Sequence, residues 1–203
     1  MRIKKTLRLS KGCPWGSMLA GKIIIISGPS GSGKTTLYKK LLKDCHILVK
    51  SVSVTTRPKR PGEKNGRDYI FMTHKEFLSR KQRGYFLESQ KVFDNYYGTP
   101  YKNVKDLLGA GKNVLLCIDV KGARVVTRKF RNVLRIFIKT PSVSVLKRRL
   151  RERGSEDAKT INLRLKTAKK ELKEAQKYDY VIINNDLKTA YRHLRKIIIA
   201  NVF

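Results

Sequence analysis

The fold is decided by the stretch Gly28-Pro-Ser-Gly-Ser-Gly-Lys34-Thr35, which matches the phosphate-loop pattern G-x-x-x-x-G-K-[ST]. An aliphatic run at 22–27 precedes it, and leucines at helical spacing follow it within 34–43. Strand, loop and helix in this order are the context that the pattern requires. Glycines let successive backbone N–H groups turn towards phosphate oxygens, and the helix start adds its positive dipole end. The stretch therefore predicts a site for a nucleoside triphosphate.

Two side chains of the loop have distinct predicted roles. Lys34 supplies a mobile positive charge for the β- and γ-phosphates, and the hydroxyl of Thr35 can bind Mg²⁺. The loop alone does not say which reaction follows.

Further aliphatic or β-branched runs occupy 47–54, 113–118, 133–138 and 180–183, with helix-like stretches between most of them. Such alternation predicts an α/β fold with a parallel sheet flanked by helices. Because the runs are apolar throughout, the strands are expected to be buried on both faces. A segment rich in proline, glycine and aromatic residues breaks the alternation and predicts a small inserted α+β subdomain. The stretch 142–177 is basic and almost wholly helical.

Several ordered motifs lie outside the phosphate loop. The stretch 51–69 reads SVSVTTRPKRPGEKNGRDY, and Glu88, N-Y-Y-G-T at 95–99 and I-D-V-K-G at 118–122 follow it. Together they resemble guanylate kinase, and the match extends from about Gly21 to the C-terminus. The resemblance implies transfer of the γ-phosphoryl group of ATP to GMP, and also to dGMP, with Mg²⁺ as cofactor.

The resemblance also implies three functional parts. The P-loop core comprises 21–54 and 103–203, a GMP-binding subdomain comprises 55–102, and a helical lid at 142–170 lies within the second core segment. The basic N-terminal extension 1–20 is expected to be loose.

The acceptor site is predicted from the chemistry of GMP. A phosphate dianion calls for planar guanidinium donors, which Arg57 and Arg60 supply. Guanine offers N1–H and N2–H side by side, so one carboxylate, Glu88 by resemblance, accepts from both, whereas adenine would leave it unsatisfied. A solvated basic loop remains the alternative for the arginines, and a salt-bridging role for Glu63 and Asp119. The predicted GMP-binding residues are Ser53, Arg57, Arg60, Glu63, Tyr69, Glu88, Tyr97, Thr99 and Asp119, of which Asp119 is also expected to hold water on Mg²⁺.

The donor site and the lid are assigned by resemblance. The predicted ATP-binding residues are Gly28, Ser30, Gly31, Ser32, Gly33, Lys34, Thr35, Thr36 and Asn184. The predicted catalytic residues are Lys34, Arg149, Arg153 and Arg164, which would neutralise the transferring phosphoryl group. Arg148 and Arg151 are equally basic neighbours, so charge alone does not choose among them. No general base is expected, because the phosphate oxygens of GMP are themselves nucleophiles.

Three positions depart from the family pattern. Cys117 stands where relatives usually carry an acid, Lys121 where glutamine is common, and Asn185 where an acid is often found. The first two are expected near the Mg²⁺ and the phosphates, so they bear on the rate of the reaction.

The chain carries 47 Lys and Arg residues against 15 Asp and Glu, a formal charge of +32. Only a minority of this charge is assigned to the two nucleotides. Three explanations of the surplus stay open: it steers nucleotides inward, in which case added salt should lower kcat/KM, it offsets an ion-rich or polyanion-crowded interior, or it reflects genome composition. Neither a nucleic-acid-binding motif nor a membrane span is recognisable, so we expect no specific nucleic-acid partner. A noncatalytic guanylate-kinase-like interaction module and kinase action on another monophosphate are the rival functions.

Three dispersed cysteines, Cys13, Cys45 and Cys117, form no CxxC pair and predict free thiols in a reducing compartment. A cytoplasmic monomer or homodimer is expected, with organellar targeting by the basic extension as the less favoured alternative.

Overall fold

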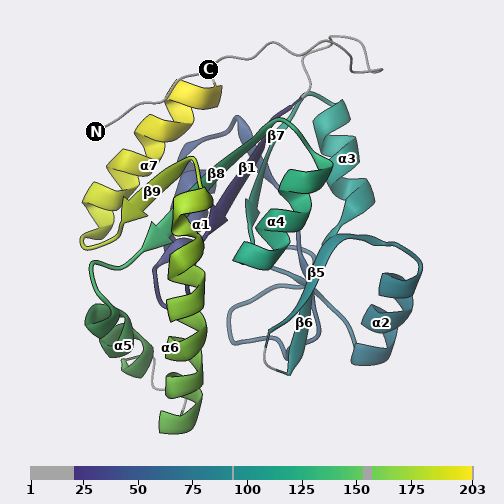
Figure 1. Ribbon diagram of the computed structural model, residues 1–203. Coiled ribbons are helices and arrows are strands. Elements are labelled where there is room, and N and C mark those ends of the chain that lie inside the picture. Colours follow the sequence, from purple (N-terminus) through teal and green to yellow (C-terminus); the bar gives the residue numbers. More distant parts are fainter. Residues whose placement is uncertain (1–20, 93, 153–156, 203) are drawn as a thin grey trace.

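The computed structural model describes residues 21–92, 94–152 and 157–202. Its larger sheet has five strands in the order β2-β7-β1-β8-β9, and every neighbouring pair is parallel (Figure 1). These strands are β1 (Ile23–Ser27), β2 (Leu48–Lys50), β7 (Asn113–Cys117), β8 (Val133–Lys139) and β9 (Tyr180–Ile183). A parallel sheet of this kind places the C-terminal ends of its strands along one edge, where α/β proteins bind ligands.

Helices cover both faces of this sheet. Ile24 and Ile26 of β1 pack in one apolar cluster with α1 (Lys34–Asp44) and α7 (Leu187–Val202). Ile23 and Ile25 pack in a second cluster with α3 (Tyr101–Gly109) and α4 (Val120–Lys129). Alternate residues of a strand point to opposite faces, so a strand with four consecutive isoleucines serves two cores at once. The predicted α/β class with a helix-flanked parallel sheet is confirmed.

The prediction of one strand at 47–54 is wrong. Residues 48–50 form β2 in the larger sheet, whereas Val54–Thr55 forms β3 in a separate sheet with the order β4-β3-β6-β5. Both pieces are rich in β-branched and aliphatic residues, so the apolar pattern runs on while the chain passes from one sheet to the other. Hydrophobic periodicity reports burial and not which sheet a strand joins.

The second sheet begins at Val54, one residue before the predicted GMP-binding subdomain, and otherwise falls inside it. Its other strands and its helix are β4 (Ile70–Phe71), β5 (Phe86–Val92), β6 (Asn95–Pro100) and α2 (His74–Gln82). Its core is built by Val54, Phe77 and Phe86, with the two phenylalanine rings stacked 4.4 Å apart. Leu87 of β5 instead belongs to the core of the larger sheet. The sheet is thereby packed against the core at the strand that carries Glu88.

The basic helical segment forms α5 (Val143–Arg151), α6 (Ala158–Lys173) and the 3₁₀ turn η1 (Glu174–Lys177). Ser142 and Asp157 cap the two α-helices by accepting from backbone N–H groups. The helices pack on each other through an apolar cluster formed by Leu146, Leu150, Ile161, Leu165 and Ala168.

Several sequence predictions fall on residues that the structure does not describe. These include the extension 1–20 with Cys13, and Arg153 between the two lid helices. The cysteines in the described ranges, Cys45 and Cys117, are free thiols, as predicted. Among the described helices, none is long and apolar enough to cross a membrane.

Candidate active site

The phosphate loop joins β1 to α1 and depends on glycine for its shape. Gly28 has a φ of 142° and Gly33 a φ of 88°, both in the region that side chains disfavour. A Cβ on Gly28 would lie 2.0 Å from the carbonyl oxygen of Ile138, and one on Gly33 would lie 2.2 Å from Nδ2 of Asn184. Both positions therefore require glycine for conformation and for space.

Polar groups around the loop have capacity left for a ligand. The Nζ of Lys34 donates to the carbonyl of Pro29 at 2.9 Å, and Thr35 is exposed in the first turn of α1. Asn184 is buried and donates from Nδ2 to the carbonyl of Ser32 at 2.8 Å. Its Oδ1 and the hydroxyl of Ser32 are buried without a hydrogen-bond partner within the described part of the chain. Buried polar atoms are rarely left unsatisfied, so these two point to a polar ligand.

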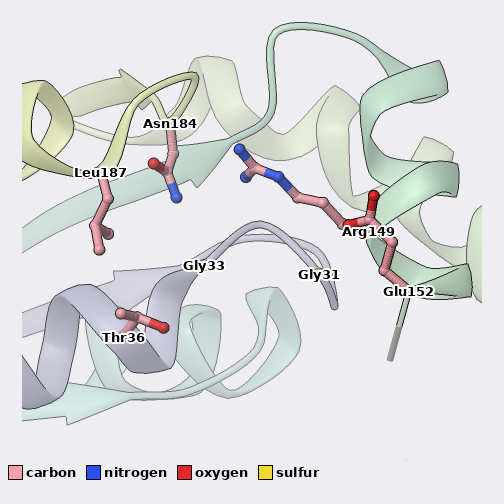
Figure 2. Close-up of a pocket in the computed structure, with 7 residues that line it drawn as sticks. All are labelled: Gly31, Gly33, Thr36, Arg149, Glu152, Asn184 and Leu187. Atoms are coloured by element: carbon pink, nitrogen blue, oxygen red, sulfur yellow. The ribbon is translucent and has the colours of Figure 1, made fainter. Parts of the chain in front are cut away.

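A cavity of about 330 Å³ opens beside this loop (Figure 2). Figure 2 shows Asn184 and Leu187 facing the loop across the opening, with Arg149 reaching in from α5. An Nη2 hydrogen bond of 3.3 Å joins Arg149 to the carbonyl of Asn185. The lining consists of Gly31, Gly33, Thr36, Arg149, Glu152, Asn184 and Leu187.

The helices α5 and α6 contact the loop. Arg164 of α6 donates from Nη1 to the hydroxyl of Ser30 at 2.9 Å. A Cβ on Gly31 would lie 3.0 Å from the side chain of Leu146, so α5 packs directly on the loop. Arg148 and Arg151, by contrast, are exposed. The structure thus brings Arg149 and Arg164, and not these neighbours, to the loop.

In the second sheet, the Arg57 side chain is buried and held by Glu63. Its Nη1 and Nη2 donate to the two carboxylate oxygens at 2.7 and 2.5 Å. These bonds hold the pKa of the Glu63 carboxyl below its ordinary value and raise the pKa of the Arg57 guanidinium. The guanidinium also lies 5.1 Å from the ring centre of Tyr69, which is 6.2 Å from that of Tyr97. Arg60 is exposed, and its backbone N–H donates to Glu63 at 2.9 Å.

A buried carboxyl lies where this sheet meets the core. Glu88 is 7% exposed, and its Oε1 accepts from the Thr99 hydroxyl at 2.6 Å. Burial raises the pKa of Glu88 to about 7 against the pull of that bond. Asp119 caps α4 by accepting from the backbone N–H of Gly122 at 2.7 Å. A Cβ on Gly122 would lie 2.5 Å from Oε2 of Glu88, so any larger residue there would displace that carboxylate.

Cys117 lies between the residues of the phosphate loop and those of the second sheet. Cys117 is the last residue of β7 and is the strand partner of Ile26 in β1. Its thiol lies within electrostatic range of both Lys34 and Tyr69. Burial raises the pKa of this thiol, whereas Lys34 lowers it. Both groups of residues therefore lie at one edge of the parallel sheet. Ser53 is half-buried, and its carbonyl accepts from the N–H of Ile70 in the second sheet at 2.9 Å.

Three residues at this edge were not predicted from the sequence. Leu187 and Glu152 line the cavity, and Glu171 of α6 has a half-buried carboxyl within electrostatic range of Lys34. Only Glu171 had a usable signal, because it follows Arg164 by seven residues and so shares its face of the helix.

The chain has close relatives among known proteins. Residues 20–201 match the family described as guanylate kinase. The chain belongs to the guanylate kinase family. Over 151 residues it is 44% identical to a guanylate kinase of Thermotoga maritima, covering 74% of this chain and 73% of that one. Over 148 residues it is 46% identical to the guanylate kinase of Rickettsia bellii, covering 73% and 78%.

A solved structure extends this result to the fold. The crystal structure of guanylate kinase from Anaplasma phagocytophilum matches with a TM-score of 0.75 and 37% identity, covering 92% of this chain and 88% of that one. The family resemblance predicted from the motifs is confirmed. Guanylate kinase relatives at this identity favour an enzyme over the noncatalytic interaction module.

Proposed function

We propose that this guanylate kinase transfers the γ-phosphoryl group of ATP to GMP, and also to dGMP, giving ADP and GDP. One observation carries the proposal: an intact phosphate loop contacted by Arg164 shares a sheet edge with the buried pair Glu88 and Thr99. A triphosphate and a guanine base would each find matching groups there.

On the donor side, the phosphates of ATP would lie in the loop with Lys34 on the β- and γ-phosphates. The cavity would take the nucleoside, with Asn184 offering an unsatisfied buried oxygen and Leu187 an apolar surface. Arg149 and Arg164 would neutralise the transferring group, and Arg153, outside the described residues, is proposed to join them. Such positioning and charge stabilisation account for most of the catalysis of phosphoryl transfer.

On the acceptor side, Arg57 would bind the GMP phosphate together with Arg60, Tyr69 and Tyr97. The bidentate pair with Glu63 fixes the guanidinium plane before the substrate arrives, which lowers the entropy lost on binding. The Glu88 carboxylate would accept N1–H and N2–H of guanine. The phosphate oxygen attacks directly, so no protein base is needed.

The residues present fit a magnesium ion. Mg²⁺ prefers oxygen ligands, keeps several waters and is held by few protein groups plus substrate phosphates. The exposed hydroxyl of Thr35 and the carboxylate of Asp119 supply such oxygens. Because Gly122 engages Oδ1 of Asp119, the other oxygen can hold a metal-bound water. When bound, the ion would offset charge on the β- and γ-phosphates.

The decisive experiment is a coupled assay of ADP formation with GMP, dGMP, AMP and UMP, each with and without Mg²⁺. We expect Mg²⁺-dependent turnover with the two guanine nucleotides and little with the others. Stoichiometric ATP binding without turnover would favour the interaction module. Turnover with AMP or UMP at the GMP rate would contradict the role of Glu88.

The binding of guanine is expected to depend on pH. Because Glu88 must be ionised to accept two N–H groups and its pKa is about 7, affinity should fall as the pH drops. From pH 8 to pH 6 the ionised fraction falls about tenfold. Calorimetry with guanosine, which lacks a titrating phosphate, should show a comparable rise in Kd. A pH-independent Kd, or an equal dependence in Glu88→Gln, would contradict the assignment.

A methyl group on Gly122 should weaken GMP binding selectively. In Gly122→Ala the new Cβ would press on Oε2 of Glu88, and displacement of that carboxylate should raise KM for GMP on the order of tenfold. Alanine favours helices, so the fold should not suffer. The control is Gly109→Ala, where a Cβ meets nothing within 4 Å. An unchanged KM for GMP in Gly122→Ala would show that Glu88 does not read the base.

We also place the enzyme in the cytoplasm as a monomer or homodimer. The free thiols of Cys45 and Cys117 support a reducing compartment.

A further inference from the structure

The lid helix α6 carries an acidic residue in an otherwise basic sequence. Its 16 residues, AKTINLRLKTAKKELK, contain six Lys or Arg residues and one acid, Glu171. The lysines are exposed, whereas Glu171 is half-buried. A carboxylate withdrawn from water in a helix of exposed lysines needs a partner on the protein side.

The helix face that carries Glu171 is fixed by two observations. Arg164 lies seven residues earlier, two helical turns away on the same face, and donates to the Ser30 hydroxyl at 2.9 Å. The adjoining face packs Leu165 and Ala168 against α5. The rotation of α6 is thus set, and Glu171 lies on the face of the helix from which Arg164 reaches the phosphate loop.

The charged neighbours of Glu171 lie in the candidate active site. Its carboxyl is within electrostatic range of the ammonium groups of Lys34 and Lys121 and of the carboxylate of Asp119. Burial raises the pKa of Glu171 to about 7, an effect that Lys34 and Lys121 oppose. The Lys34 ammonium itself donates to Pro29 at the base of the loop. The surroundings of Lys34 therefore include both the loop carbonyl of Pro29 and the carboxylate of Glu171.

We propose that Glu171 is a positioning residue for Lys34: the helix face that brings Arg164 to the loop also brings a carboxylate that orients the Lys34 ammonium for phosphoryl transfer. This inference rests on the proposed function. A lysine ammonium is a compact charge on a flexible stem, so its direction depends on what surrounds it. Glu171 restricts that direction from the lid side and does not touch the substrate.

The proposal predicts that Glu171→Gln lowers kcat and at the same time tightens ATP binding. Loss of the orienting charge should lower kcat about 10-fold to 100-fold, since small misplacements of catalytic groups have effects of that size. Loss of a negative charge near the phosphates should tighten ATP binding about threefold to tenfold. A variant that merely loosens the lid would instead weaken ATP binding and turnover together.

The test measures the Kd of ATP by calorimetry without GMP, and kcat in the coupled assay. Glu174→Gln is the matched control, because its carboxylate pairs with Arg124 and Lys177, away from the loop, and both parameters should stay within about twofold. Glu171→Asp, which keeps the charge but shortens its reach, should fall between wild type and Glu171→Gln in kcat.

A wild-type kcat in Glu171→Gln, or a parallel loss of ATP affinity and kcat, would overturn the role of Glu171 and leave the proposed function unaffected. A wild-type chain that forms no GDP would overturn the proposed function and, with it, this role of Glu171. The two failures are distinguishable because the wild-type assay is read independently of the variants.

Discussion

Arg164→Ala is expected to lower kcat on the order of 10³-fold, with a much smaller change in the affinity for either nucleotide. The arginine reaches the loop from α6, where its Nη1 lies 2.9 Å from the Ser30 hydroxyl. In the proposed reaction its positive charge stabilises the phosphoryl group most strongly in the transition state, between donor and acceptor. Its loss should therefore destabilise the transition state more than it weakens nucleotide binding. Single-turnover measurement of GDP formation would separate this effect from product release.

Arg149→Ala should have an effect of similar size, because its guanidinium lies in the cavity beside the loop. The neighbouring Arg148 provides the matched control: it is exposed, and its Nε lies 3.6 Å from the Glu152 carboxylate. Such surface pairs contribute little, so Arg148→Ala should retain kcat within about twofold. If both Arg149→Ala and Arg164→Ala also stayed within twofold of wild type, the lid arginines would not be catalytic.

The sequence was most informative where local chemistry requires particular residues. The phosphate loop could be predicted because its glycines serve a positive φ and a close approach, as at Gly28 and Gly33. The strand β1 could be predicted because a short run of isoleucines, closed by glycines, fits a strand that is buried on both faces. In both cases the constraint acts within a few residues of chain.

The sequence was least informative where the constraint is tertiary. Residues 47–54 look like one strand because apolar periodicity does not record the change of sheet. A salt-bridging role for Glu63 was left open as an alternative, but its pairing with Arg57 depends on a loop that folds back on itself, so the partner could not be predicted. Glu171 was missed because a single acid among lysines looks like a solvated charge. Its spacing from Arg164 indicated a shared helix face, but the packing of α6 was needed to show that this face meets the loop.

Much of the positive charge remains on the surface after these assignments. Some of it is locally neutralised, as in the pairs Lys40 with Asp44 and Arg135 with Asp179. The lysines of α6 are exposed and form no ion pair with another residue of the described ranges: Lys159, Lys166, Lys169, Lys170 and Lys173. Helix α6 thus presents a basic outer face to solvent, whereas Arg164 and Glu171 lie on its other side. General attraction of anions is thereby separated from the proposed chemistry.

Glu88→Gln is expected to stabilise the fold while it destroys the recognition of guanine. The carboxyl ionises near pH 4.5 in the unfolded chain and near pH 7 in the folded one, so the folded state loses stability as the pH rises between these values. A glutamine of the same size keeps an oxygen for Thr99 and has no such loss. At pH 8 the free energy of unfolding should increase by up to about 3 kcal/mol, and near pH 4.5 it should change little.

The same substitution should lower kcat/KM for GMP on the order of 10²-fold to 10³-fold. An amide accepts one N–H and turns its own N–H₂ towards the second guanine donor, which leaves buried donors unsatisfied. The ratio of kcat/KM for GMP to that for AMP should fall with it, while the Kd of ATP stays unchanged.

Urea unfolding at pH 5 and pH 8, combined with assays on both monophosphates, tests the two effects on one variant. A stability gain that is equal at both pH values would mean that ionisation of Glu88 is not its source. Retained discrimination between GMP and AMP would mean that another group reads the base. If both effects appear, the folded chain maintains a destabilising buried charge at the position where guanine must be recognised, as expected for a binding group rather than a structural one.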